Sequence, residues 1–256
     1  MAKDIPTANK NPVKTWQQTI DAKGAVVPPA GRRYRAEVFQ GYMILAVVVF
    51  FILAVLAHTV AYFTFDVTIT HAVQTFNAGW FDALMYALSW IGFAPQVWII
   101  SLVVLLFLYA SGLHWETVVT FVSLVGITAL GTGIKLLVDR PRPSADLVNV
   151  LSQLKDNSFP SGHVLYFTTF VGFLLFLSYT LLKHSWWRTS LLIIFGGMVA
   201  LIGLSRIYEG QHWASDVIGA YLLGSVWLGL SILVYRWGKP RFFVNQPVAK
   251  AKEATA

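Results

Sequence analysis

The chain has 256 residues, of which 56% are hydrophobic and 12% are charged. Ordinary soluble domains carry about 25% charged residues, so this composition argues against a soluble fold and favours one integral membrane domain. The absence of cysteine excludes disulfides, thiolate metal ligands and a cysteine nucleophile. The net charge of +7 could suit nucleic acid, but most of it flanks apolar segments, where it sets membrane orientation. We therefore expect no nucleic-acid partner.

Residues 1–38 form a polar segment with four prolines and no apolar stretch. We expect a disordered cytoplasmic tail there. A cleavable signal peptide is not expected, because no hydrophobic region closely follows the initiating methionine. The membrane domain is expected over 39–237, and a second cytoplasmic tail over 238–256.

Six apolar runs make up the membrane domain, at 41–63, 95–112, 117–138, 162–183, 189–206 and 213–236. Each is long enough, or nearly so, for a helix across a hydrocarbon core of about 30 Å. Between the first two runs, residues 66–92 mix polar and aromatic side chains, which suits helices at the lipid–water boundary. The expected fold is therefore all-α: a six-span transmembrane helical bundle with an additional interfacial helical segment after the first span.

The distribution of Lys and Arg predicts the orientation of these spans. The first tail has seven, the loop after the fourth run has two and the last tail has five, so fourteen of nineteen lie on one side if there are six spans. The positive-inside rule makes that side cytoplasmic. We expect a multi-pass protein of the bacterial inner membrane with both termini in the cytoplasm. Three clusters of polar residues, at the other ends of the spans, then all face the extracytoplasmic side.

The first cluster is Lys135 with Arg142. Lys135 falls near the end of a predicted helix that Pro141 and Pro143 stop, and Arg142 is held between these two prolines. A Lys point charge and a planar Arg fork together suit a tetrahedral oxyanion such as phosphate. The alternative is that Lys135 extends to the lipid headgroups while Arg140 and Arg142 anchor the interface.

The second cluster, Pro160-Ser161-Gly162-His163, has the composition of a turn that enters the fourth span. Ser161 is a good N-cap, and Gly162 lets a ligand approach the backbone closely. The first amides of the helix and its dipole favour an anion, and His163 is positioned to donate a proton to a leaving oxygen. Capping alone explains Ser161 and Gly162, so this cluster is a weak signal by itself.

The third cluster is Ser205-Arg206 with His212 and Asp216. His212 and Asp216 are four residues apart, so on a helix that opens the sixth span they share one face. The carboxylate can accept the Nδ1 proton of the imidazole and leave Nε2 free to attack. Arg206, at the end of the fifth span, can fold back to neutralise a phosphate. A His–Asp hydrogen bond with only a structural role is the alternative.

Two other site chemistries fit these residues less well. A Ser-His-Asp hydrolase built on Ser161 lacks the Gly-x-Ser-x-Gly strand-to-helix turn, and a cationic cage has no role in ester hydrolysis. A metal site is disfavoured because permanent cations beside His163, His212 and Asp216 oppose a divalent ion. We therefore expect no metal and no cofactor.

The three clusters together resemble the signature of a known family. Lys135-x6-Arg142-Pro143, Pro160-Ser161-Gly162-His163 and Ser205-Arg206-x5-His212-x3-Asp216 are similar to the three-part signature of the type 2 phosphatidic acid phosphatase superfamily. The six expected spans are similar to those of its integral membrane members. The resemblance covers roughly residues 40–236 and leaves the two tails outside it.

This resemblance implies a metal-independent phosphatase. His212 would be the nucleophile that forms a phosphohistidine, Asp216 would orient it, and His163 would protonate the leaving oxygen. The phosphoryl oxygens would be held by the remaining signature residues: Lys135, Arg142, Ser161, Gly162 and Arg206. Water would then release phosphate from His212.

The implied substrates are phospholipid or isoprenoid phosphates in the membrane. Undecaprenyl diphosphate is the first expectation, because an outward-facing site fits recycling of that carrier lipid. Phosphatidylglycerol phosphate and phosphatidic acid are close behind. A lipid-linked phosphotransferase with the same site is one alternative. A phosphate-binding transporter or scaffold is another, and the nucleophile and acid pair disfavours it. The sequence leaves the oligomeric state open.

Overall fold

The computed structural model of the chain describes residues 29–76 and 78–242. Most of the two expected tails, at 1–38 and 238–256, therefore lies outside the described residues. Residues 29–38 belong to a helix, so helical structure begins inside the segment expected as a tail. The chain divides into two compact units, residues 1–45 and 46–256, and the candidate site lies entirely in the second.

Within the described ranges, all regular secondary structure is helical, which confirms the predicted all-α class. In chain order the helices are α2 (Pro29–Thr59), α3 (Thr64–Gln74), α4 (Gly79–Ile91), α5 (Gln96–Ala110), α6 (His114–Val138), α7 (Gly162–Tyr166), the π-helical turn η1 (Phe167–Val171), α8 (Gly172–Leu181), α9 (Trp186–Tyr208) and α10 (Ala214–Phe242). The segments α7, η1 and α8 run on as one span over Gly162–Leu181.

Five helical segments are long and apolar enough to cross a membrane, and a sixth arises if α4 and α5 count as one span. These two helices meet at a bend of 65°. Alone, α5 has 15 residues and a length of about 22 Å, which is short for a hydrocarbon core of about 30 Å. The five to six candidate spans agree with the predicted bundle, and the sixth is reached only if α4 and α5 form one bent span. The helices α3 and α4 occupy the stretch predicted as interfacial.

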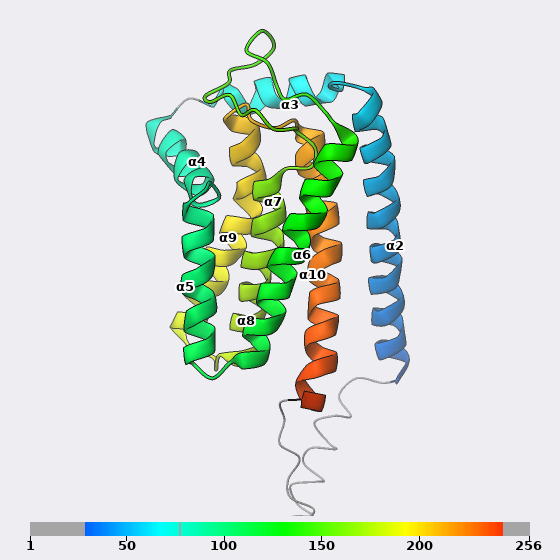
Figure 1. Cartoon of the computed structure of the whole chain (residues 1–256), viewed down its shortest axis with the longest axis vertical. Helices are drawn as coiled ribbons and strands as arrows, with labels where there is room; N and C mark the ends of the chain where they lie inside the picture. The colour runs from blue at the N-terminus through cyan, green and yellow to red at the C-terminus, as the bar shows by residue number, and fades with distance from the viewer. Residues whose placement is uncertain (1–28, 77, 243–256) are drawn as a thin grey trace, which may run out of the picture. The chain divides into compact units, whose positions relative to one another are not determined.

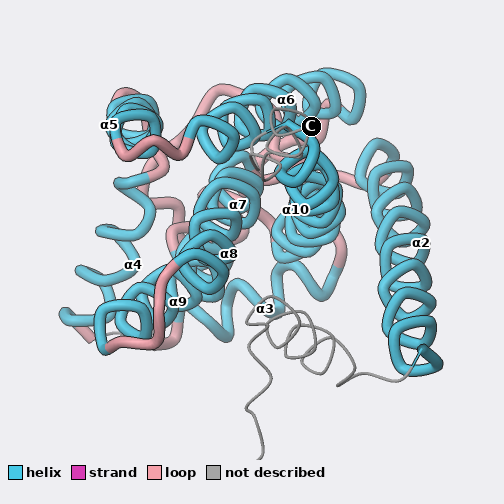
Figure 2. The backbone as a smooth tube through the Cα atoms, turned by 90° about the horizontal axis from the view of Figure 1, so that it is seen from below, coloured by secondary structure: helices cyan, strands magenta, loops and turns pink. Residues whose placement is uncertain are grey.

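The core of the bundle forms around the α7–η1–α8 span, of which 61% is buried inside the protein. Figure 2 shows this span between α6, α9 and α10. Its side chains Phe167 and Phe170 pack with Ile202 of α9, Val217 of α10 and Leu124 of α6 in one apolar cluster. The segment that begins with the Ser-Gly-His motif is thus the most enclosed part of the bundle.

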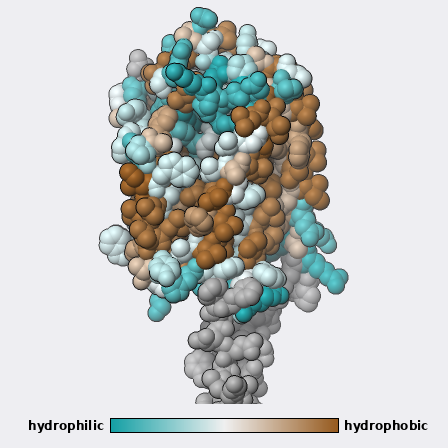
Figure 3. Space-filling model, in the orientation of Figure 1, coloured by the Kyte–Doolittle hydropathy of each residue, from teal (hydrophilic) through white to brown (hydrophobic). Residues whose placement is uncertain are grey.

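The outer surface of the helices is strongly apolar. Side chains such as Leu136 and Leu137 of α6 are 73% and 77% exposed. Figure 3 shows apolar side chains along the flank of the helices and polar side chains above them, at the end where α3 lies. An exposed apolar band of this kind is stable only in contact with lipid, so the chain is an integral membrane protein.

Two chain reversals, one between α6 and α7 and one between α9 and α10, bring the three polar clusters to that same end of the bundle. Helix α6 ends at Val138, where Asp139 turns into the left-handed region with φ 49° and Pro141 follows. Helices α9 and α10 are joined by a short turn around Gly210, whose φ is +64°. Figure 1 shows α3 lying across this end, where it contacts α9 and α10. The breaks between helices therefore position the site.

Replacement of Gly210 by alanine should destabilise the protein more than replacement of Gly112. Both glycines have positive φ, but a Cβ at Gly210 would collide with the carbonyl oxygen of Asn149, whereas no atom of the described residues lies within 4 Å of a Cβ at Gly112. The left-handed conformation alone costs a non-glycine residue about 1–2 kcal/mol. Thermal unfolding of both variants in detergent measures the difference. Equal losses in the two variants would contradict the close approach.

Candidate active site

Lys135 and Arg142, the cations of the first cluster, form ion pairs with the same carboxylate. The Nζ of Lys135 donates to Oδ2 of Asp156 at 2.6 Å and to the carbonyl oxygen of Asn157 at 2.7 Å. Arg142 donates from NH2 to Oδ1 of Asp156 at 2.7 Å, and from Nε to its carbonyl oxygen, also at 2.7 Å. One acidic side chain thus bridges both predicted phosphate ligands.

Asp156 marks a position where an anion is strongly favoured. Burial acts to raise the pKa of this carboxyl, but the hydrogen bond and charge of Lys135, together with Arg142, outweigh it and lower the pKa to about 2. The Asp156 side chain is nevertheless 58% exposed, whereas those of Lys135 and Arg142 are 15% and 10% exposed. A carboxylate with this much exposure can move into water when another anion takes its place.

Arg206, near the end of α9, is fully buried, and only some of its hydrogen-bond donors have a partner in the described structure. Its NH1 donates to Oγ of Ser89 and to Oε2 of Glu209, the latter at 3.2 Å, and its guanidinium lies 5.1 Å from the ring centre of Phe93. Within the part of the chain that the structure describes, its Nε and NH2 have no hydrogen-bond partner. Buried donors of this kind cost free energy unless a ligand satisfies them, so Arg206 retains the capacity to bind an anion.

Ser161 occupies the N-cap position of α7, as predicted, but its side chain makes no capping hydrogen bond. Its Oγ is buried and finds no partner among the residues described. Open space surrounds the position of a Cβ at Gly162, the first residue of the helix. The hydroxyl of Ser161 and the exposed start of α7 are thus both free to meet a ligand.

His212 lies in the turn before α10, which begins at Ala214. The prediction that His212 and Asp216 share a helix face is therefore wrong, although the two side chains still meet. The Nε2 of His212 is 3.1 Å from NH1 of Arg142, which can only donate, so Nε2 is the acceptor and the ring proton lies on Nδ1. The Nδ1 atom lies 3.6 Å from Oδ2 of Asp216 and 3.5 Å from Oγ of Ser158.

The surroundings of His212 keep its imidazole neutral. Burial, followed by the charges of Arg142, Arg206 and Lys135, holds the pKa of His212 well below its usual value of 6.5. The contact between NH1 of Arg142 and Nε2 of His212 shows that the first and third clusters converge. A neutral imidazole whose Nε2 carries no proton is the form that can act as a nucleophile.

Asp216 is held behind His212 by several donors. Its Oδ2 accepts from Oγ of Ser158 at 2.5 Å and from the backbone N–H of Trp213 at 2.9 Å. Its Oδ1 accepts from NH1 of Arg140 at 2.5 Å. A carboxylate with three donors keeps one orientation, so the imidazole beside it is also confined.

His163, in the first turn of α7, lies against the end of α4 and the residues that follow it. Its Nε2 donates to the carbonyl oxygen of Ser89 at 3.1 Å, and its ring packs edge-on against Phe93 at 4.6 Å. Ser89 and Phe93 also contact Arg206. His163 therefore joins the cluster through the same residues that position Arg206.

The structure thus brings the predicted residues of all three clusters together at one end of the bundle. Sequence reasoning missed the groups that pair with them, above all the carboxylates Asp156 and Glu209 and the hydroxyls of Ser89 and Ser158. The only signal for Asp156 and Ser158 was their place just before Pro160. No pattern pointed to Ser89, which lies in α4 far from the motifs.

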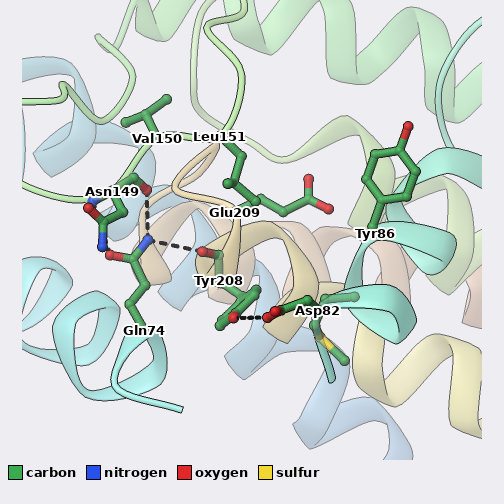
Figure 4. Close-up of a pocket in the computed structure, with 9 residues that line it drawn as sticks. Gln74, Asp82, Tyr86, Asn149, Val150, Leu151, Tyr208 and Glu209 are labelled. Carbon is green, nitrogen blue, oxygen red and sulfur yellow. Dashed lines mark hydrogen bonds between the residues drawn. The ribbon is translucent and has the colours of Figure 1, made fainter. Parts of the chain in front are cut away.

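A polar cavity of about 550 Å³ adjoins the site at Glu209. Figure 4 shows hydrogen bonds from Gln74 to Asn149 and Tyr208, and from Tyr208 to Asp82, around this cavity. Burial raises the pKa of Glu209, although Arg206 and Ser89 act to lower it. The cavity therefore reaches Glu209, the ion-pair partner of Arg206.

Comparison with known proteins identifies the family. The PAP2 superfamily model matches residues 115–240, which contain all three clusters. Phosphatidylglycerophosphatase B of Bacillus subtilis (strain 168) is 29% identical over 184 residues, which cover 68% of this chain and 85% of that protein. An undecaprenyl-diphosphatase of Sulfolobus acidocaldarius is 33% identical over 163 residues, which cover 61% of this chain and 72% of that protein.

A solved structure shares the fold. The crystal structure of a transmembrane PAP2-type phosphatidylglycerolphosphate phosphatase from Bacillus subtilis superposes with a TM-score of 0.67 at 24% identity. The match covers 78% of this chain and 98% of the other. With the arrangement of helices, the matched residues and the relatives in agreement, the chain belongs to the PAP2 superfamily.

Proposed function

We propose that this enzyme removes a phosphate group from a lipid phosphate or diphosphate through a phosphohistidine on His212, without a metal ion. The coarser activity, that of a lipid phosphatase, follows from family membership. One observation carries the finer mechanism. The Nε2 lone pair of His212 faces the cation Arg142, while the opposite edge of the ring faces the carboxylate of Asp216.

In the first step, Nε2 of His212 attacks phosphorus and an N–P bond forms as the P–O bond to the leaving group breaks. The phosphate dianion favours the protonated form of the nearby His163, which gives a proton to the leaving oxygen. In the second step, water attacks the phosphorus and the N–P bond breaks. The neutral His163 takes the proton from that water, so both imidazoles return to their starting forms.

The cations lower the barrier by stabilising charge on the phosphoryl oxygens. Lys135, Arg142 and the free donors of Arg206 would bind these oxygens once the phosphate displaces Asp156, and Ser161 and Gly162 add a hydroxyl and a backbone amide. The nearby carboxylates Asp156, Asp216 and Glu209 are each paired with Lys or Arg. Carboxylates engaged in this way are poor ligands for a divalent metal, which supports a metal-independent reaction.

The substrate would reach the site sideways from the lipid. A cavity of about 100 Å³ between α6 and α7 is lined by Lys135 and Gly162 and continues along apolar residues such as Leu165. A head group can therefore meet the cations while its tails stay among hydrocarbon chains. The names of the relatives support both undecaprenyl diphosphate and phosphatidylglycerol phosphate as substrates. Undecaprenyl diphosphate remains our first proposal because an extracytoplasmic site fits recycling of that carrier.

Phosphate release by the wild type should persist in a chelator, because no metal is needed. In His212→Ala the rate of phosphate release should fall by at least about 10³-fold, because the nucleophile is lost. The assay uses purified protein in detergent with a panel of lipid phosphates and diphosphates in excess EDTA. Trapping of labelled phosphate on the wild-type protein, and not on the variant, provides the control. Strict dependence on added divalent metal would contradict the mechanism. A product other than free phosphate would favour the phosphotransferase alternative.

Asp156→Asn should bind inorganic phosphate more tightly than the wild type, by about fivefold, because a neutral amide competes less well for Lys135 and Arg142. Asp146→Asn is the matched control, since Asp146 is an exposed acid in the same loop without an ion pair in the described structure. Inhibition of turnover by added phosphate measures the affinity. Unchanged or weaker inhibition in Asp156→Asn would show that Asp156 does not occupy the place of the phosphate.

The orientation can be read from single cysteines, because the chain has none of its own. Gln153 lies in the exposed loop before the second cluster, and Lys183 lies in the exposed loop between α8 and α9. In intact cells, an impermeant maleimide should label Gln153→Cys, whereas Lys183→Cys should react only after permeabilisation. The reverse pattern would place the site on the cytoplasmic side.

A further inference from the structure

A buried ion-pair cluster lies behind Asp216 and involves residues outside the three motifs. Arg140 was considered above as an interface anchor, yet it has no exposed surface. Its NH1 donates to Oδ1 of Asp216 at 2.5 Å, and its NH2 donates to Oδ2 of Asp66 at 3.0 Å. Neither carboxylate is exposed to solvent. One guanidinium therefore bridges two fully buried carboxylates.

The remaining donors of Arg140 fix its position. Its Nε donates to the carbonyl oxygen of Ala61 at 3.1 Å, and its NH1 also donates to Oγ of Ser215 at 2.7 Å. The guanidinium carbon lies 5.1 Å from the ring centre of Phe63. A planar fork with several fixed partners holds its geometry better than a flexible ammonium group would.

Asp66 anchors this guanidinium from the interfacial helix α3. Its Oδ1 accepts from the backbone N–H of Ser215 at 2.8 Å, and its Oδ2 accepts from Oγ of Ser215 at 2.8 Å and from the N–H of Phe63 at 3.0 Å. Ser215 immediately precedes Asp216 in the first turn of α10. Asp66 therefore holds both the Arg140 fork and the backbone that carries Asp216.

The charge of the cluster suits the chemistry proposed for His212. A carboxylate buried without a cation tends to take up a proton, and a protonated Asp216 would no longer place a negative charge 3.6 Å from Nδ1 of the imidazole. Arg140 supplies the cation. Two carboxylates and one guanidinium leave a net charge of −1, which compensates the positive charge on the ring of a phosphohistidine protonated at Nδ1.

We infer that Arg140 and Asp66 are positioning residues: they keep Asp216 ionised and aligned so that His212 presents Nε2 to the phosphorus. The inference rests on the proposed roles of His212 and Asp216. It assigns a role to an arginine inside the x6 spacer of the first motif, and to a carboxylate on a helix that carries no motif residue. Neither side chain touches the substrate.

The test is a double-mutant cycle on phosphate release from a lipid phosphate. Arg140→Gln should lower kcat by about 10- to 100-fold, as loss of an outer partner of a functional group commonly does, with KM changed less than about twofold. In an Asp216→Asn background, Arg140→Gln should cause no further loss of kcat, because Arg140 acts through that carboxylate. Asp66→Asn leaves the Arg140–Asp216 pair in place and should lower kcat less than Arg140→Gln does.

Arg188→Gln is the matched control. Arg188 is also buried, but it donates to the carbonyl oxygen of Tyr179 and contacts His184, far along the chain from the site and without a carboxylate partner in the described structure. Its substitution should lower the thermal unfolding midpoint and leave kcat of the folded protein within about twofold. If Arg140→Gln does not fold, the Asp66→Asn variant and its combination with Asp216→Asn provide the same cycle.

Two outcomes would overturn the inference. One is a loss of kcat in Arg140→Gln no larger than in Arg188→Gln. The other is a double variant whose kcat falls by the product of the two single-variant factors for Arg140→Gln and Asp216→Asn, which would mean that the two residues act independently. A wild-type protein that releases no phosphate from any lipid would instead contradict the proposed function, so the two failures are distinguishable.

Discussion

Charge compensation at the end of an apolar bundle is the constraint on which the site depends. Removing an unpaired ion from water costs several kcal/mol, and four cations gather here within a few side chains of one another. Each pairs with a carboxylate from another part of the chain or the next turn. The cations are Lys135, Arg140, Arg142 and Arg206, and the carboxylates are Asp66, Asp156, Glu209 and Asp216.

These pairs differ in how easily they separate, and the difference divides the site into a fixed part and an exchangeable part. The pairs of Arg140 with Asp66 and Asp216 are fully buried, so breaking either pair would leave a charge without a partner and away from solvent. Asp156 is 58% exposed. In the proposed mechanism, an incoming phosphate exchanges with the exposed Asp156 while the buried pairs keep His212 in place. The difference in burial thus separates the fixed ion pairs of Arg140 from the exchangeable carboxylate of Asp156.

Local patterns in the sequence were sufficient for the spans. The run 117–138 corresponds to α6 at His114–Val138, and the run 189–206 corresponds to α9 at Trp186–Tyr208. Hydropathy locates apolar runs in the sequence but does not report a change in the direction of the helix axis. The 65° bend between α4 and α5 could therefore not be predicted. The motif residues could be selected as candidates from the sequence, because an imidazole, a carboxylate and several cations at fixed spacing have few other uses in a membrane.

The residues that pair with those motif residues could not be predicted from the sequence, for a physical reason. Asp66 meets Arg140 across 74 residues, and Ser89 meets Arg206 across 117. Such pairs depend on how α3 and α4 pack against α9 and α10, and no local periodicity encodes that packing. The position of His212 shows the same limit on a smaller scale. Four-residue spacing suggested one helix face, whereas Gly210 and the turn that follows it delay the helix until Ala214.

The most direct test of the account is a structure of the protein with orthovanadate, which adopts the five-coordinate geometry of phosphoryl transfer. We expect vanadium bonded to Nε2 of His212, its oxygens bound by Lys135, Arg142 and Arg206, and Asp156 displaced toward water. Vanadate bound away from His212, or bound while Asp156 still bridges Lys135 and Arg142, would contradict it.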